Sequence, residues 1–438
     1  MIYFSTNKSS IPVSIKKATL EGLAPDGGLY IPSEIPRFSQ DEIALLEGAS
    51  FNNIAFAIAK KFVDGSVPPD QLSDIIESCY TFDTPIVQLD QNTFIEELFC
   101  GPTLAFKDYG ARFLARLTGY FAAEEEKLIT VLVATSGDTG SAVAYGFQGI
   151  ANTRVVLLYP SAKVSRLQEQ QLTTAGGNVH ALEVLGDFDD CQRMVKQAFV
   201  DPDLNKSLTL TSANSINISR LIPQSFYYAW ATMQLKERFG IHEPLFAVPS
   251  GNYGNLTAGV LAKRMGFPLG HFIAASNAND SVTRYIDEGR YEPRPTITTL
   301  STAMDVGNPS NFARLRYFYH NDHDSMAKDI TGIAVSDEET IATIQSVHDS
   351  FGYVMDPHTA VAYRALERFR AIDSNAEKAG IALSTAHPVK FLDAIESALG
   401  QEIAIPSNLT ELMEKKKSAT LISSEYKELA SFLNGLDQ

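Results

Sequence analysis

Short apolar runs rich in β-branched residues recur along the chain after residue 127. They occupy residues 128–134, 154–159, 245–248, 272–275 and 381–383. Gly, Pro or Ser residues flank these runs, which show no alternation with polar residues. This pattern is typical of short strands that are buried on both faces of a sheet. We therefore predict five buried strands at these positions.

Helical patterns separate the apolar runs. After Lys107, apolar residues recur at spacings of three and four, at Phe113, Leu114, Leu117, Tyr120 and Phe121. Further helices are predicted over 53–62, 71–80 and 256–265, and Ser336 with Glu339 forms a capping box before another. Strands that alternate with helices indicate an α/β protein whose sheets are mostly parallel.

The length of 438 residues allows two or three domains. A segment dense in glycine and proline, residues 22–36, suggests that the start of the chain is organised differently from the rest. We expect an N-terminal part over 1–95, a smaller α/β domain over 96–225 and a larger α/β domain over 226–438.

Composition narrows the class of protein. Hydrophobic residues make up 45% and charged residues 20%, which is typical of a globular protein. The net charge of −16 argues against binding to nucleic acid or to an anionic membrane. No signal peptide or apolar stretch of about 18 residues is evident. Three widely spaced cysteines favour a reducing compartment, so we expect a cytoplasmic protein.

Two turns between a strand and a helix could bind anions. The first is ATSGDTGSA at 134–142, and the second is VPSGNYGNLTAG at 248–259. Backbone N–H groups at a helix N-terminus stabilise a negative group. Neither turn has the GxxxxGK[ST] pattern, so a nucleoside triphosphate is not favoured. Each could also be a tight turn of small residues, and the Asp138 carboxylate would repel an anion unless it points elsewhere.

Lys107 lies between apolar residues in the segment GPTLAFKDYGARF. Burial in such surroundings favours the neutral amine, and an amine can form a Schiff base with an aldehyde. A phosphate-binding turn together with a reactive lysine meets the requirements of pyridoxal phosphate. An ordinary exposed helix lysine is the alternative.

Four segments, in chain order, resemble the threonine synthase family: FKDYGARF, TSGDTGSA, SANSINISRLIPQ and PSGNYGNLTAG. That family belongs to the pyridoxal-phosphate enzymes of the tryptophan-synthase β-subunit type. The resemblance covers almost the whole chain and includes AMDVGNPSNFARL and STAHPVKF. It implies fold type II, with two open, mostly parallel sheets flanked by helices and the cofactor between them, plus the extra N-terminal part.

The resemblance also implies the roles of individual residues. Lys107 would bond to the cofactor, and Thr385 would contact its ring nitrogen. The cofactor phosphate would be held by Gly251, Asn252, Tyr253, Gly254 and Asn255. Relatives commonly have Phe at the position of Tyr253, and some have Asp at that of Asn255, but neither change removes a backbone donor. The predicted substrate-binding residues are Ser136, Asp138, Thr139, Lys163, Ser215, Asn217 and Arg220.

The implied reaction converts O-phospho-L-homoserine and water to L-threonine and phosphate, with Lys107 as the leading base. Arg112 and Arg166 are further candidate cations for the substrate phosphate. We expect a small-molecule substrate, no nucleic-acid or membrane partner, and a monomer or homodimer. Two alternatives stay open: a dehydratase acting on serine or threonine, and a catalytically silent homologue that binds pyridoxal phosphate or a phosphorylated amino acid.

Other candidate sites are weaker. His320 and His323 have a spacing that could suggest a metal, but the segment NDHD is predicted to be a solvated polar loop. His387 is expected to start a helix, because Pro388 follows it. No GxSxG elbow is present, which argues against a serine hydrolase.

Overall fold

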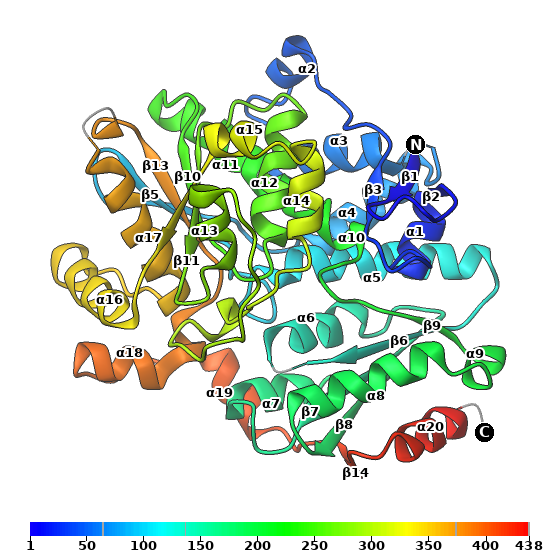
Figure 1. Ribbon diagram of the computed structural model, residues 1–438. Coiled ribbons are helices and arrows are strands. Elements are labelled where there is room, and N and C mark those ends of the chain that lie inside the picture. Colours follow the sequence, from blue (N-terminus) through cyan, green and yellow to red (C-terminus); the bar gives the residue numbers. More distant parts are fainter. Residues whose placement is uncertain (64, 136, 373–374, 437–438) are drawn as a thin grey trace.

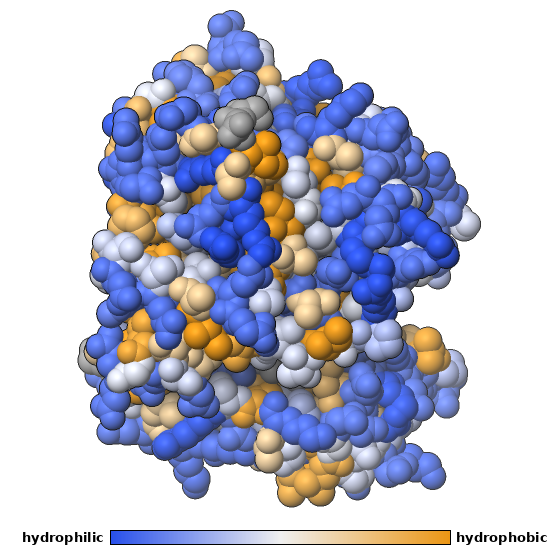
Figure 2. Space-filling view, turned by 60° about the vertical axis from the view of Figure 1, so that its left-hand side comes forward, coloured by the Kyte–Doolittle hydropathy of each residue, from blue (hydrophilic) through white to orange (hydrophobic). Residues whose placement is uncertain are grey.

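The computed structural model describes residues 1–63, 65–135, 137–372 and 375–436, with only the backbone of 407 and 408. Two large sheets, each covered by helices, make up most of the molecule (Figure 1). In that view the five-stranded sheet and its helices lie below the six-stranded sheet. Figure 2 shows a face on which hydrophilic residues dominate and hydrophobic ones form small separate groups.

The first 80 residues form a separate layer beside helix α5 (Lys107–Glu124). The three-stranded antiparallel sheet has the order β2-β1-β3, and four helices follow or join it. The elements are β1 (Ile2–Ser5), β2 (Val13–Ser14), α1 (Ile15–Glu21), β3 (Tyr30–Pro32), α2 (Gln40–Ala44), α3 (Phe51–Val63) and α4 (Pro69–Cys79). Their apolar side chains join the largest hydrophobic core of the protein.

The first large sheet has six strands in the order β12-β11-β10-β13-β5-β4, and all neighbours are parallel except β4 and β5. The strands are β4 (Ile86–Gln88), β5 (Thr93–Glu97), β10 (Leu245–Pro249), β11 (Phe272–Ser276), β12 (Ile330–Ala334) and β13 (Gly380–Ser384). The three predicted strands in this sheet are confirmed.

Helices cover both faces of this sheet. The elements around it are α11 (Gln224–Phe239), α12 (Gly254–Arg264), α13 (Ser281–Glu288), η1 (Thr302–Met304), α14 (Phe312–Phe318), α15 (His323–Asp329), α16 (Asp337–Phe351), α17 (Pro357–Arg370), η3 (Pro388–Phe391) and α18 (Leu392–Leu399). Helices α16 and α17 share one core with the sheet, and α11 and α12 share the other. The predicted capping box of Ser336 and Glu339 is present at the start of α16.

The second large sheet has five parallel strands in the order β14-β8-β7-β6-β9. They are β6 (Ile129–Ala134), β7 (Thr153–Pro160), β8 (Val179–Leu185), β9 (Thr209–Thr211) and β14 (Thr420–Ser423). One face packs on α5 (Lys107–Glu124), α6 (Asp138–Phe147) and α7 (Arg166–Thr173), and the other on α8 (Phe188–Val200), α9 (Leu204–Ser207) and α20 (Tyr426–Gly435). Short α10 (Ile218–Leu221) and α19 (Ser407–Glu414) are connectors.

The sheets cross the boundaries expected from the sequence. Strand β4 and most of β5 belong to the expected N-terminal part, 1–95, but lie in the first large sheet. Strand β14 belongs to the expected larger domain, 226–438, but lies in the second large sheet, on which α20 packs. A second difference concerns the segment NDHD. It is not all loop, because Asp322 caps α15 and His323 begins that helix. In the described residues, no cluster of His, Cys, Asp and Glu could hold a metal.

Glu96 is an unusual residue on β5. Its side chain is fully buried, and neither carboxylate oxygen has a hydrogen-bond partner among the described residues. It points to the same face of the sheet as Phe94, two residues earlier, which belongs to the largest core. Burial raises its pKa well above the usual value of 4.5. The folded protein therefore binds this proton more tightly than the unfolded chain does.

We expect Glu96→Gln to make stability less dependent on pH. Because the pKa of Glu96 is higher in the folded protein, the free energy of unfolding is highest below about the ordinary pKa of 4.5. It then falls by about 1.4 kcal/mol per pH unit as pH rises toward the pKa in the folded state. The amide does not ionise, so its advantage over the parent should grow between pH 5 and 7. Urea unfolding at several pH values measures this, with exposed Glu34→Gln as the control. Parallel curves for the parent and the variant would contradict the prediction.

Candidate active site

A cavity of about 1470 Å³ lies between the two large sheets. Its wall includes Ala134 at the end of β6, Pro249 at the end of β10 and Thr385 just after β13. The N-termini of α5, α6, α7 and α12 also reach it. The carboxyl ends of parallel strands and the N-termini of the following helices are where α/β proteins bind ligands.

Lys107 is the first residue of α5 and is partly exposed to the cavity. The segment before it is fastened to the end of the first sheet, because the Phe106 N–H donates to the Thr385 carbonyl at 2.9 Å. Burial lowers the pKa of Lys107, although the negative charge of Asp138 acts in the opposite direction. The site thus favours the amine form that the sequence predicts.

Residues 250–253 connect β10 to α12, so the segment 251–255 includes the first two residues of that helix. A side chain at Gly251 would place its Cβ 2.7 Å from the Ala303 carbonyl oxygen and 2.8 Å from the Met304 Cα. Tyr253 has a left-handed backbone conformation with φ of 58°, after which α12 begins at Gly254. The close packing of Gly251 and the left-handed conformation of Tyr253 together place the first turn of α12 at the cavity wall.

The side chains of this turn are held in fixed orientations. The Asn255 Oδ1 accepts hydrogen bonds from the hydroxyls of Tyr227 and Tyr228, both at 2.7 Å. Its Nδ2 is therefore turned away from them, and this buried donor has no partner within the described part of the chain. The Asn252 Oδ1 accepts from the Ser310 N–H at 2.6 Å. An orphaned donor at a helix N-terminus fits an anionic group such as a phosphate.

The other predicted anion-binding turn, residues 134–142, does not present all of its N–H groups to a ligand. The Thr135 Oγ1 accepts from the N–H of Gly137 at 3.1 Å and from that of Gly140 at 2.9 Å. These two donors are therefore occupied within the turn. Thr139 lines the cavity, whereas Ser136 lies outside the described residues.

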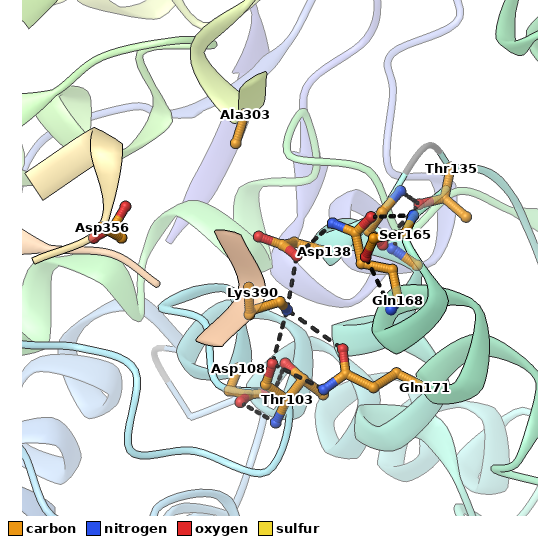
Figure 3. A network of polar contacts seen from close by, with 12 residues as sticks. Thr103, Asp108, Thr135, Asp138, Ser165, Gln168, Gln171, Ala303, Asp356 and Lys390 are labelled. Atoms are coloured by element: carbon orange, nitrogen blue, oxygen red, sulfur yellow. Dashed lines mark hydrogen bonds and ion pairs between the residues drawn. The ribbon is translucent and has the colours of Figure 1, made fainter. Parts of the chain in front are cut away.

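Asp138 forms an ion pair with Lys390, and the Oδ1–Nζ distance is 2.7 Å (Figure 3). Burial would raise the pKa of Asp138, but the positive charges of Lys390 and Lys107 outweigh burial and lower it. The carboxylate is thus ionised and paired. This arrangement resolves the difficulty that a lone carboxylate would repel an anion at the turn.

Arg220 is a buried cation on the cavity wall. Its Nη1 donates to the Ala213 carbonyl at 2.7 Å, and its buried Nε has no partner among the described residues. Burial lowers its pKa to about 10. Lys163 and Arg166 also line the cavity but are exposed at its edge.

Two predicted residues are not brought to the cavity. Arg112 points elsewhere, because its guanidinium donates to the carbonyls of Ser78 and Cys79. Asn217 caps α10: its Oδ1 accepts from the Ser219 N–H at 3.0 Å and its Nδ2 donates to the Thr19 carbonyl at 2.9 Å. Ser215, by contrast, lines the cavity and accepts a hydrogen bond from the Asn252 side chain.

His358 and Lys390 are two polar residues of the wall that no sequence pattern predicted. His358 accepts the Ala303 N–H at its Nε2 and contacts Asp356 at 2.7 Å through Nδ1, so it supports the segment against which Gly251 packs. Ala303 is distant from His358 in the sequence, and Asp138 and Thr103 are distant from Lys390, so no local pattern pairs them. His387 caps η3, as predicted.

Fold and site together define a pyridoxal-phosphate enzyme of fold type II. Residues 80–384 match the family model described as pyridoxal-phosphate dependent enzyme. Residues 2–80 match threonine synthase N terminus, and residues 359–433 match threonine synthase, C-terminal. The chain belongs to the threonine synthase family.

Individual relatives agree with this assignment. The threonine synthase of Serratia marcescens is 42% identical, with 97% of each chain covered, and that of Escherichia coli is 42% identical over 91% of each. The crystal structure of pyridoxal-phosphate-bound threonine synthase from Brucella melitensis superposes with a TM-score of 0.93 at 36% identity, over 99% of both chains. Threonine deaminase from Solanum lycopersicum shares only the fold, at 16% identity over 86% of this chain and 98% of its own and a TM-score of 0.57.

Gly251→Ala should weaken binding of pyridoxal phosphate by at least about tenfold, because the new methyl group would displace the segment around Ala303 or shift the turn. Absorbance titration of the apoprotein with the cofactor measures the dissociation constant. Gly435→Ala is the matched control, since a methyl group there would meet no atom within 4 Å. Equal affinities of both variants and the parent would contradict the assignment of this turn.

Proposed function

We propose that this protein converts O-phospho-L-homoserine and water to L-threonine and phosphate. The observation that carries the proposal is the position of Lys107 in one cavity with the turn of 251–255 and the buried Arg220. An amine, a phosphate-binding turn and a separate cation suit a cofactor and a substrate that both carry phosphate. Membership of the threonine synthase family supports the same reaction.

Lys107 would hold pyridoxal phosphate through its aldehyde until the substrate amine replaces it, and the cofactor would supply a ring that accepts negative charge from the substrate α-carbon. The turn 251–255 would hold the cofactor phosphate through its N–H groups and the Asn255 Nδ2. Thr385 would face the ring nitrogen. A hydroxyl there can hydrogen-bond the nitrogen without forcing its protonation, as a carboxylate would.

Lys107 would move the protons of the reaction. Its lowered pKa leaves more of the free amine near neutral pH than an ordinary lysine has. The amine can therefore remove the proton from Cα, pass it on and then remove one from Cβ. After phosphate leaves Cγ with one proton, protons are returned to Cγ and Cα, and water adds its hydroxyl to Cβ. A pKa lowered toward neutrality also extends activity to lower pH than an unperturbed lysine would allow.

The two anionic groups of the substrate would lie at different places. Thr139 and Ser136 would bind the carboxylate at the first turn, where Asp138 is neutralised by its partner. Arg220 would bind the phosphate from the interior, with Lys163 and Ser215 nearer the edge. A dianionic phosphate would then satisfy the unpartnered Arg220 Nε.

The reaction is tested by incubating holoenzyme with O-phospho-L-homoserine. We expect phosphate and L-threonine in equal amounts, and neither product from Lys107→Ala. Borohydride reduction of the holoenzyme should label the peptide that contains Lys107. A keto acid from serine or threonine would instead indicate a dehydratase, and cofactor binding without turnover would indicate a silent homologue.

Arg220→Met should raise KM for O-phospho-L-homoserine by about tenfold or more, since a charge-assisted contact to phosphate contributes on the order of 1.5–3 kcal/mol. Initial rates of phosphate release give KM. Arg112→Gln is the comparison, because its guanidinium donates to the backbone carbonyls of Ser78 and Cys79 and lies away from the cavity wall. An unchanged KM in the Arg220 variant would remove Arg220 from the substrate site.

We further propose that the enzyme works in the cytoplasm on small molecules alone, as a monomer or homodimer. Its three cysteines are free thiols, as in reducing compartments. Its charge of −16 disfavours nucleic acid. In the described part of the chain, no helix is long and apolar enough to cross a membrane.

A further inference from the structure

Lys390, a residue of the cavity wall, contacts three separate segments of the chain (Figure 3). Its Nζ lies 2.7 Å from the Asp138 Oδ1, 2.9 Å from the Thr103 carbonyl oxygen and 3.4 Å from the Gln171 Oε1. An ammonium group has three N–H donors, so each has an acceptor. The side chains of Lys390 and Asp138 are 0% and 5% exposed, respectively, which makes this ion pair a buried one.

The contacts of Lys390 lead toward Lys107 from two directions. Asp138 acts directly on the charge of Lys107. Thr103 donates through its N–H and its hydroxyl to the two oxygens of Asp108, both at 2.8 Å, and Asp108 follows Lys107 in the chain. Lys390 therefore contacts both Asp138, whose charge acts on Lys107, and Thr103, which holds the residue after Lys107. All three of its N–H donors face protein acceptors.

The buried pair also spans the two halves of the site. Lys390 belongs to η3, which follows Thr385 and the first sheet, whereas Asp138 begins α6 on the second sheet. The Gln168 Nε2, from α7, donates to the same Asp138 oxygen at 3.2 Å. Because one buried charge without its partner is far more costly than the pair, each residue holds the other in place.

We propose that Lys390 is a positioning residue that acts through Asp138: it fixes this carboxylate at the first turn and balances its charge beside Lys107. The inference rests on the proposed function, because it assigns a purpose to the charge state of Lys107. The charged groups acting on Lys107 are Asp138, which favours the ammonium, and Arg220 and Lys390, which favour the amine. With the pair intact, the charge of Lys390 partly offsets the larger effect of Asp138 at Lys107.

The test is the titration of Lys107 in the apoprotein. Competitive labelling with acetic anhydride, a neutral reagent, followed by mass spectrometry of the Lys107 peptide, gives the amine fraction as a function of pH. The variants are Lys390→Met, Asp138→Asn and the double variant, which has no buried charge left unpaired. Below the midpoint, each unit of pKa changes the labelling rate about tenfold.

Lys390→Met leaves Asp138 unbalanced, so Lys107 should label several-fold more slowly than in the parent at the same pH. Asp138→Asn leaves Lys390 unbalanced and should give faster labelling. The double variant should label at a rate between those of the two single variants. Equal labelling midpoints in the parent, Asp138→Asn and the double variant would overturn the proposal, even if Lys390→Met fails to fold.

The outcome is independent of the proposed reaction. Labelling requires neither cofactor nor substrate, so a protein that releases no phosphate from O-phospho-L-homoserine can still show the expected order of labelling rates. Conversely, an active parent enzyme with unchanged midpoints in the variants would refute the role of Lys390 alone. The control peptide is that of Lys206, whose side chain is 76% exposed and distant in the fold from the cavity wall.

Discussion

The balance of buried charge between the two sheets is the constraint on which the site depends. A cavity that lowers the pKa of a lysine keeps that lysine away from water, yet it must also admit ligands that carry carboxylate and phosphate. Asp138 is paired with Lys390, while the buried Nε of Arg220 has no partner among the described residues. Arg220 thus leaves a positive group available to anionic ligands.

This charge arrangement requires backbone segments from distant parts of the sequence to meet. The Ala105–Ala386 bridge and the Phe106–Thr385 hydrogen bond fasten the start of α5 to the end of β13. The Arg314 side chain, fully buried, connects α14 to the Tyr30 carbonyl in the N-terminal layer and to the segment around residue 216. The N-terminal layer is thereby packed against the segments that frame the cavity, although none of its described residues lines the cavity.

The sequence predicted the central strands and the two turns because these depend on local patterns. Continuous β-branched runs predict strands at 128–134 and 245–248 whatever their neighbours are. Strand 179–185 was not predicted, since its His and Glu residues interrupt the apolar run. The side-chain partners were also beyond reach: no local pattern pairs Asp138 with Lys390, and no spacing shows that Arg112 turns toward Ser78 while Arg220 faces the cavity.

The last strand of the chain has a consequence for biosynthesis. Strand β14 pairs with β8 and closes one edge of the second sheet, and α20 then packs against α8. Because β14 and α20 follow β8 at a long distance in the chain, the edge of β8 stays unpaired until they are synthesised, and the nascent chain exposes its backbone groups and the apolar face of α8. Removal of β14 and α20 would leave the longer strand β8 at the edge of the sheet, open to association with other chains.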